Sequence, residues 1–126
     1  MVPIPTEHQS QVTVIDWCNA HAHLHPALSR IFAIPNGSNK SIVAAMKFKR
    51  EGLKPGVPDL FLPWQIADYG GAFIEMKRKG GSLSDAQIEW VDWLRVEAGY
   101  VVFVCWSADE AIQCIKNYLC LHDKKR

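Results

Sequence analysis

The run Tyr-Val-Val-Phe-Val-Cys-Trp at residues 100–106 restricts the fold more than any other part of the sequence, because it is apolar throughout and has the length of one strand. A strand that is apolar at every position must be covered on both faces, which is typical of a central strand in an α/β protein. Helical patterns precede and follow it. We therefore expect an α/β sandwich that contains this run as a central strand.

Capping sequences predict most of the helices. Residues 6–9 (Thr-Glu-His-Gln) and 84–87 (Ser-Asp-Ala-Gln) both have the form of a capping box, in which the first and fourth side chains satisfy free backbone amides. The helix that follows Ser84 should bury Ile88, Val91, Leu94 and Ala98 and end at Gly99. The expected helices are residues 7–20, 39–51, 85–98 and a last one capped by Ser107.

Strand signals lie between these helices. A short apolar run at 31–34 is followed by Asp59-Leu60-Phe61-Leu62 and by residues 71–77, and the last two are joined by a loop containing Gly70 and Gly71. The expected element order is α-β-α-β-β-α-β-α, a mixed α/β arrangement. A length of 126 residues allows one core, so we expect a single domain over residues 1–126.

Composition excludes several classes of protein. Apolar residues make up 48% and charged residues 21%, as in ordinary globular proteins and unlike disordered chains. The start lacks the pattern of a signal peptide, and no apolar run reaches the roughly 18 residues of a membrane span, so we expect a cytoplasmic protein, in the host cytoplasm if it is viral. The four cysteines lack CxxC spacing, and three of them lie in apolar or helical contexts, which favours buried free thiols.

The spacing Glu75-Met76-Lys77 indicates a site. Side chains alternate along a strand, so Glu75 and Lys77 share a face while Met76 points the opposite way. If Asp59 lies on an antiparallel neighbour, two carboxylates meet beside an ammonium group, and a divalent cation such as Mg²⁺ is the usual remedy for their repulsion. The alternative is that Asp59 ends a turn, that Glu75 and Lys77 are exposed strand residues, and that the lysine forms a surface ion pair.

Other residues have two readings each. His21, His23 and His25 alternate as in a metal site, but a structural zinc needs four ligands, so we favour histidines placed after a helix C-terminus. Trp90 and Trp93 should be core or interface, whereas Trp64 is expected in a loop beside the site, able to contact DNA. The net charge is only +1, and the basic stretch from Lys40 to Lys54 is either a solvated face or a phosphate contact.

Several segments together resemble one family. They are Pro5-Thr6-Glu7-His8, Ile34-Pro35-Asn36-Gly37, Gly56-Val57-Pro58-Asp59-Leu60, Phe73-Ile74-Glu75-Met76-Lys77, Gln87 with Trp90 and Leu94, Gly99-Tyr100-Val101-Val102 and Ser107-Ala108-Asp109-Glu110-Ala111. The chain resembles the VRR-NUC branch of the PD-(D/E)xK nucleases, in particular its stand-alone bacteriophage and bacterial members. The resemblance covers nearly the whole chain. It implies a restriction-endonuclease-like fold, a mixed β-sheet flanked by helices.

The resemblance also implies residue roles. Asp59 and Glu75 would hold Mg²⁺ or Mn²⁺ with the Met76 backbone carbonyl, and Glu7 would be a direct or water-mediated ligand. Lys77 would orient or deprotonate the attacking water. Gln87 would brace the site or touch the scissile phosphate.

The implied function is a metal-dependent, structure-specific DNA endonuclease that acts as a homodimer on branched DNA such as four-way (Holliday) junctions in DNA repair. The helix with Trp90 and Trp93 would supply the dimer interface. The alternative is a catalytically weak DNA-binding module, or a flap- or nick-directed nuclease in phage replication or repair. The expected DNA contacts are Asn36, Lys40, Lys47, Lys49, Arg50, Lys54 and Trp64.

Overall fold

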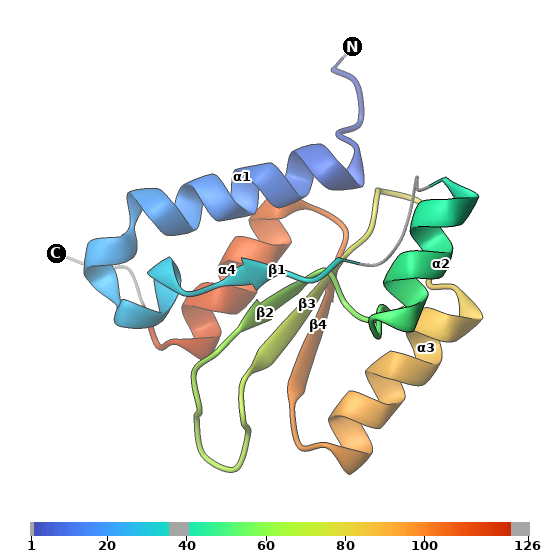
Figure 1. Cartoon of the computed structure of the whole chain (residues 1–126). Coiled ribbons are helices and arrows are strands. Elements are labelled where there is room, and N and C mark those ends of the chain that lie inside the picture. Colours follow the sequence, from blue (N-terminus) through green and yellow to red (C-terminus); the bar gives the residue numbers. More distant parts are fainter. Residues whose placement is uncertain (1, 36–40, 122–126) are drawn as a thin grey trace, which may run out of the picture.

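A computed structural model of the chain describes residues 2–35 and 41–121. Figure 1 shows a small mixed β-sheet with helices on both faces. The elements in chain order are α1 (Glu7–Ala20), the 3-10 helices η1 (Ala22–Leu24) and η2 (Pro26–Ser29), β1 (Phe32–Ala33), α2 (Ile42–Arg50), β2 (Leu60–Leu62), β3 (Ala72–Met76), α3 (Asp85–Asp92), the π-helix η3 (Trp93–Glu97), β4 (Val101–Cys105) and α4 (Ala108–Tyr118). The expected mixed α/β class is confirmed. The 3-10 helices and the π-helix were not predicted.

The sheet has the strand order β1-β2-β3-β4. The β1-β2 and β2-β3 pairs are antiparallel, and β3-β4 is parallel. The prediction that residues 100–106 form a central strand is therefore wrong, because β4 lies at an edge of the described sheet. Its apolar character has another cause: Phe103 and Cys105 pack into one core, while Val102 and Val104 pack into a second core on the opposite face.

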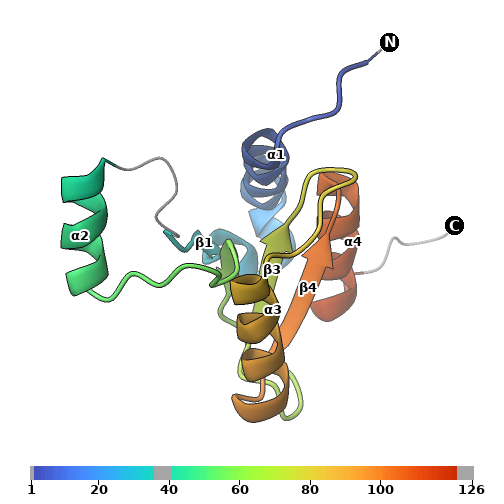
Figure 2. The same cartoon turned by 90° about the vertical axis from the view of Figure 1, so that its right-hand side faces the viewer.

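An apolar core lies on each face of the sheet, so the molecule has three layers, with the sheet between two layers of helices. In the larger core, Val14 of α1 and Ile115 of α4 pack against Leu60, Ile74 and Met76 of the sheet, all of them fully buried. In the smaller core, Val91 and Leu94 pack against Val102 and Phe73. Full burial of one such side chain stabilises the fold by about 1.5–3 kcal/mol. The helices α1 and α4 thus cover one face of the sheet and α3 covers the other (Figures 1 and 2).

Both capping boxes are confirmed. Thr6 and Gln9 bond each other's backbone amides at the start of α1, and Ser84 and Gln87 do the same for α3. The predicted buried face of the third helix is partly wrong, because Ile88 and Ala98 are exposed.

The α3 face that meets the sheet runs through Gln87, Val91 and Leu94, so Ile88 is rotated away from it. Beyond Asp92 the chain widens into the π-helix η3, in which the Ala98 amide bonds the Trp93 carbonyl, five residues back. The ordinary helical period therefore does not apply to Ala98.

The helix α2 stands away from the sheet (Figure 2). It was predicted over residues 39–51, of which 39 and 40 lie outside the described residues. None of its residues is buried, and the apolar side chains of Ile42, Val43 and Met46 are 80%, 79% and 63% exposed. An amphipathic helix whose apolar face is exposed to solvent is typical of an interaction surface.

Other sequence expectations concern membranes and thiols. No helix in the described ranges is long and apolar enough to cross a bilayer. All four cysteines are free, as predicted, and Cys18 and Cys105 are buried. Burial raises the pKa of the Cys18 thiol to about 11, so it stays protonated and unreactive at neutral pH.

Gly56 fixes the segment that leads to Asp59. Its φ is +92°, and a Cβ there would lie 2.7 Å from the Ala86 carbonyl carbon and oxygen at the start of α3. We expect Gly56→Ala to lower the free energy of unfolding by about 2–4 kcal/mol, because left-handed backbone strain adds to a backbone clash. Gly52 has a φ of +102° and open space around it, so Gly52→Ala should cost only about 1 kcal/mol. Urea unfolding measures both, and equal losses would show that the contact with Ala86 is unimportant.

Candidate active site

The pairing of β2 with β3 brings the two predicted carboxylates together. Leu60 pairs with Ile74 in antiparallel register, and the next step along both strands sets Asp59 opposite Glu75. The Asp59 carboxylate also accepts a hydrogen bond of 2.7 Å from the Met76 amide. Since Ile74 and Met76 point into the larger core, Glu75 and Lys77 lie on the α3 side of the sheet.

Burial separates this site from an ordinary surface ion pair. Glu75 is 1% exposed and Lys77 is 8% exposed. Charged side chains are almost never so deeply buried unless they are paired or bind a ligand, because desolvation of a charge is costly. The alternative of a solvated ion pair on a strand is therefore wrong for Glu75 and Lys77.

The two carboxyl groups disturb each other's ionisation. Burial, together with the adjacent Asp59 carboxylate, raises the pKa of Glu75 to about 9. Burial also raises the pKa of Asp59, although the hydrogen bond from the Met76 amide opposes that shift. The buried Oε1 atom of Glu75 has no hydrogen-bond partner among the described residues. Glu75 Oε1 is therefore a buried acceptor that the described part of the chain leaves open.

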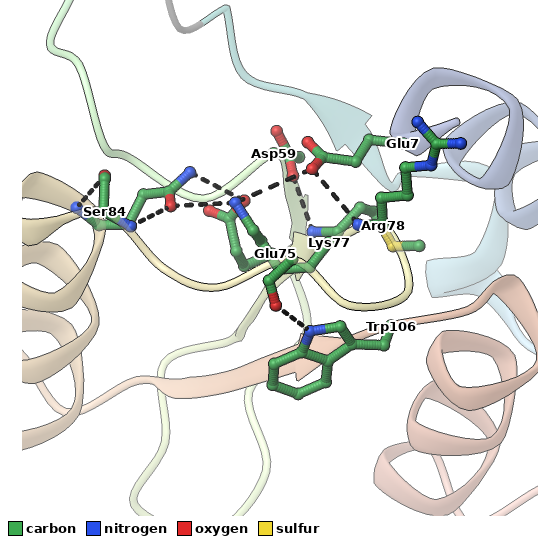
Figure 3. A network of polar contacts seen from close by, with 10 residues as sticks. Glu7, Asp59, Glu75, Lys77, Arg78, Ser84 and Trp106 are labelled. Carbon is green, nitrogen blue, oxygen red and sulfur yellow. Dashed lines mark hydrogen bonds and ion pairs between the residues drawn. The ribbon is translucent and has the colours of Figure 1, made fainter. Parts of the chain in front are cut away.

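Gln87 links the start of α3 to the site. Its Oε1 atom accepts hydrogen bonds from the Ser84 amide at 2.8 Å and from Lys77 Nζ at 3.2 Å. Its Nε2 atom donates to Glu75 Oε2 at 3.4 Å. One side chain thus completes the capping box of α3 and holds the buried lysine beside the buried glutamate, and Figure 3 shows the network around these residues.

Glu7 reaches the site from the first turn of α1. Its Oε2 atom lies 3.8 Å from Lys77 Nζ and accepts a hydrogen bond of 3.3 Å from the Arg78 amide (Figure 3). The predicted set of Glu7, Asp59, Glu75, Lys77 and Gln87 is therefore gathered at one place. Glu7 neutralises the lysine charge in this geometry.

The carboxylates of the site could supply part of the coordination shell of a hard divalent cation. Across residues 2–35 and 41–121 there is no group of three or more His, Cys, Asp or Glu side chains arranged to hold a metal ion. Mg²⁺, however, takes one or two carboxylates and keeps several waters. Asp59 and Glu75 supply two carboxylates with raised pKa values and one buried oxygen that lacks a donor, so the residues present suit such an ion.

Trp64 is not beside the site. It follows β2, whereas Asp59 precedes β2, so the antiparallel hairpin carries Trp64 to the far end of the strands, five residues or roughly 15 Å from Asp59. Its carbonyl accepts a hydrogen bond from Tyr118, and its ring packs edge-on against His25. The prediction that Trp64 lies in a loop beside the site is wrong because a hairpin loop is remote from the opposite strand ends.

The three histidines have local roles. His21 stacks on Trp17 and bonds the Trp17 carbonyl at 2.8 Å near the end of α1, as expected for a residue after a helix C-terminus. The ring of His25 accepts a hydrogen bond from the Ala27 amide at the start of η2. His23 stacks at longer range on His21.

The basic residues predicted to contact DNA are spread over different surfaces. Lys47, Lys49 and Arg50 are exposed on α2, away from the sheet (Figure 2). Lys54 lines a hollow of about 460 Å³ with Trp90 and Trp93. The helix α2, which carries three of these residues, projects from the body of the molecule (Figure 2). Asn36, Lys40 and the C-terminal basic residues 124–126 lie outside the described residues.

Trp106 belongs to the surroundings of the site, and sequence reasoning missed it. Its indole nitrogen donates to the Gly81 carbonyl at 2.8 Å, in the loop between Lys77 and Gln87 (Figure 3). The Lys77 amide in turn donates to the Cys105 carbonyl at 2.8 Å. The available signal was topological: parallel strands end at the same edge, so the residue after β4 lies beside the residue after β3.

Comparison with known proteins agrees with this geometry. A solved structure described as a VRR_NUC domain protein is 30% identical, covers 96% of this chain and 93% of its own, and has a TM-score of 0.79. No curated protein matches the sequence. The family described as the VRR-NUC domain matches residues 2–109, which include every gathered site residue. The resemblance seen in the sequence is thus confirmed, and the chain belongs to the VRR-NUC family.

Proposed function

We propose that the protein is a divalent-metal-dependent endonuclease that hydrolyses DNA phosphodiester bonds. Its active-site residues are Asp59, Glu75 and Lys77. Membership of the VRR-NUC family implies a nuclease-type function and a DNA substrate. The observation that carries the finer proposal is the buried carboxylate pair, which has raised pKa values and a lysine held beside it by Gln87. A binding surface alone would not need to bury two like charges at such cost.

Asp59 and Glu75 would hold the cation, with the Met76 backbone carbonyl as a further ligand and Glu7 as a direct or water-mediated one. A Mg²⁺ or Mn²⁺ ion bound there would supply Lewis acidity and neutralise charge on the phosphate. The two carboxylates keep the cation on the α3 face of β3, the same face as Lys77. The site therefore presents cation and ammonium group to one phosphate.

Lys77 is placed to orient the attacking water. Its Nζ atom is held between Gln87 Oε1 at 3.2 Å and Glu7 Oε2 at 3.8 Å, so its position is fixed from two helices. A fixed ammonium group donates hydrogen bonds to water or phosphate oxygen and needs no reorganisation during the reaction.

We propose branched DNA, with four-way junctions as the leading substrate, and a homodimer as the active form. Two exposed apolar surfaces support the dimer: the face of α2 formed by Ile42, Val43 and Met46, and the hollow that Trp90 and Trp93 line. Seating α2 of one copy in the hollow of a second copy would cover both. A two-fold axis would then direct two sites at two strands.

The test is cleavage of labelled four-way junction, flap, nicked and plain duplex DNA in Mg²⁺, Mn²⁺ or EDTA. We expect cleavage with either ion, none in EDTA, and faster cutting of the junction than of plain duplex. Preference for a flap or nick would replace the substrate proposal and keep the nuclease. Tight binding of DNA without cleavage under any condition would support a DNA-binding module instead.

The dimer gives a separate prediction. Met46→Glu and Trp93→Glu should each convert a dimer, of twice 14.2 kDa, into a 14.2 kDa monomer, because a charge would be buried in an apolar contact. Ala45→Glu, on the same helix but off the apolar face, should stay dimeric. Light scattering after size exclusion measures the mass. A wild type that is monomeric at every concentration would contradict the proposal.

A further inference from the structure

A second cavity adjoins the active site. Its volume is about 860 Å³, and it lies between the N-terminal segment 2–5, the first two turns of α1 and the junction of β4 with α4. Val2, Ile4 and Val12 form much of its apolar wall, with Trp106 at one side and Lys79 and Asp109 as its charged residues. Because Val2, Ile4 and Val12 are 88%, 45% and 43% exposed, the cavity is open to solvent, and its volume is more than large enough to admit a nucleoside. None of the catalytic roles above uses this cavity.

The chain connects this cavity directly to the site. Lys79 follows Lys77 by two residues, and His8, another lining residue, follows Glu7. Trp106 follows Cys105, whose carbonyl accepts the Lys77 amide at 2.8 Å. The Trp106 side of the cavity therefore lies beside the end of β3 that carries Lys77.

Trp106 is prepared as a stacking surface. The indole N–H is bonded to the Gly81 carbonyl at 2.8 Å, which fixes the ring (Figure 3). The side chain is nevertheless 39% exposed, and with the N–H already bonded, the indole presents no free donor. Stacking of a base on such a ring is sequence-tolerant, because every base has a π-face.

The charges favour a base inside and a phosphate at the rim. The charged lining residues are Lys79 and Asp109, whose opposite charges balance. The interior therefore has no net attraction for a dianion. Asp109 can accept from the exocyclic amino group of a base, and Lys79 can contact the backbone phosphate. The apolar wall suits the ring of the base.

We propose that this cavity binds an unpaired nucleobase next to the phosphate that is cut, stacked on Trp106. The inference rests on the proposed nuclease function and narrows its substrate. DNA with an unpaired nucleotide beside the cut, as at a flap or an open branch point, is then bound better than continuous duplex, in which every base is already stacked and paired.

The first test uses the wild-type protein in EDTA with flap DNA and with nicked duplex of the same sequence. An unpaired 2-aminopurine beside the expected cut reports stacking by its fluorescence. We expect about tenfold tighter binding of the flap and quenched fluorescence. Trp106→Ala should lose both, whereas Trp106→Phe keeps a ring and should retain both. Equal losses in Phe and Ala variants would assign Trp106 to holding Gly81 and overturn the proposal.

A second pair of variants keeps the test independent of Trp106. Val12→Glu places a carboxylate in the cavity wall at an exposed helix position, and Asn19→Glu makes the same charge change on α1 outside it. Val12→Glu should remove the roughly tenfold difference in affinity between flap DNA and nicked duplex, and Asn19→Glu should keep that difference. Equal behaviour of the two variants would overturn the proposal and leave the cavity to another ligand.

The outcomes separate this inference from the nuclease itself. If the wild type cuts DNA with Mg²⁺ but neither prefers unpaired bases nor responds to Val12→Glu, only the cavity proposal fails. If it cuts no DNA, yet Val12→Glu weakens binding of the flap and Asn19→Glu does not, the nuclease proposal fails, and only the binding of an unpaired base in the cavity is supported.

Discussion

Glu75→Gln will abolish metal-dependent cleavage and make the metal-free protein more stable. Glutamine has the shape of glutamate, so the contact with Gln87 and the packing of β3 are kept. It removes a buried group that must take up a proton on folding at pH 8, because the pKa of Glu75 is about 9 in the folded protein, and with it a carboxylate ligand for a cation. Cleavage should fall by at least about a hundredfold, as for loss of one strong charge-stabilising group. The free energy of unfolding in EDTA at pH 8 should rise by about 1 kcal/mol or more.

The sign of the stability change follows from the pKa of Glu75. Its value is about 9 in the folded protein and 4.5 without the fold, so between these values the native state binds more protons than the unfolded state. The contribution of Glu75 to the free energy of unfolding is therefore greatest below pH 4.5 and is lost as the pH rises toward 9. The variant lacks this group and should lose less stability over that window.

Thermal unfolding in EDTA from pH 5 to pH 9 measures the difference. We expect a higher Tm for Glu75→Gln at pH 8, by about 3–5 °C, and a smaller gap at pH 5. Glu97→Gln, at an exposed position, is the matched control and should follow the wild type. A Glu75→Gln protein that still cuts DNA, or that unfolds below the wild type at pH 8, would refute the site assignment.

Lys77→Ala will stop cleavage while DNA binding persists. Lys77 is 8% exposed, and its ammonium group is held by Gln87 and Glu7, so its position in the site is fixed. We expect kcat to fall by about 10²–10³-fold, the range found when one pre-positioned donor is removed. Affinity for DNA should change by only a few-fold, since one phosphate contact of several is lost.

The measurement is single-turnover cleavage at saturating Mg²⁺, because Lys77 also lowers the pKa values of Asp59 and Glu75 and its loss weakens cation binding. Lys49→Ala on α2 is the comparison, since an exposed phosphate contact should alter affinity and its salt dependence but leave kcat unchanged. A fall in kcat of less than tenfold for Lys77→Ala would remove that residue from the chemistry.

Short-range patterns in the sequence were reliable for local structure. Thr6 with Gln9 and Ser84 with Gln87 start helices because cap and amide lie within four residues of each other. The alternation of strand side chains places Glu75 and Lys77 on one face for the same local reason. Family resemblance then joined Glu7 and Gln87 to the site, although they are 68 and 12 residues from Glu75.

Where expectations failed, distant parts of the chain decided the outcome. The apolar run of β4 indicates that both faces of the strand are covered, but its position at the edge of the sheet depends on which strands pair. Trp64 is close to Asp59 in sequence, yet the hairpin separates them. Ile88 matches a helical period, but Gln87 takes the inward position because the buried carboxylates of the sheet face it.

The sequence by itself determined the starts of α1, α3 and α4, the mixed α/β class and the identities of the five residues gathered at the site, whereas α2 begins at Ile42 and not at residue 39. Only the tertiary structure decided that Asp59 lies opposite Glu75, that both carboxylates are dehydrated enough to resist ionisation, and that Trp106 fixes the loop after Lys77. Caps and side-chain alternation are set within a few residues. Register, burial and electrostatic coupling arise only when segments far apart in the chain pack together and exclude water.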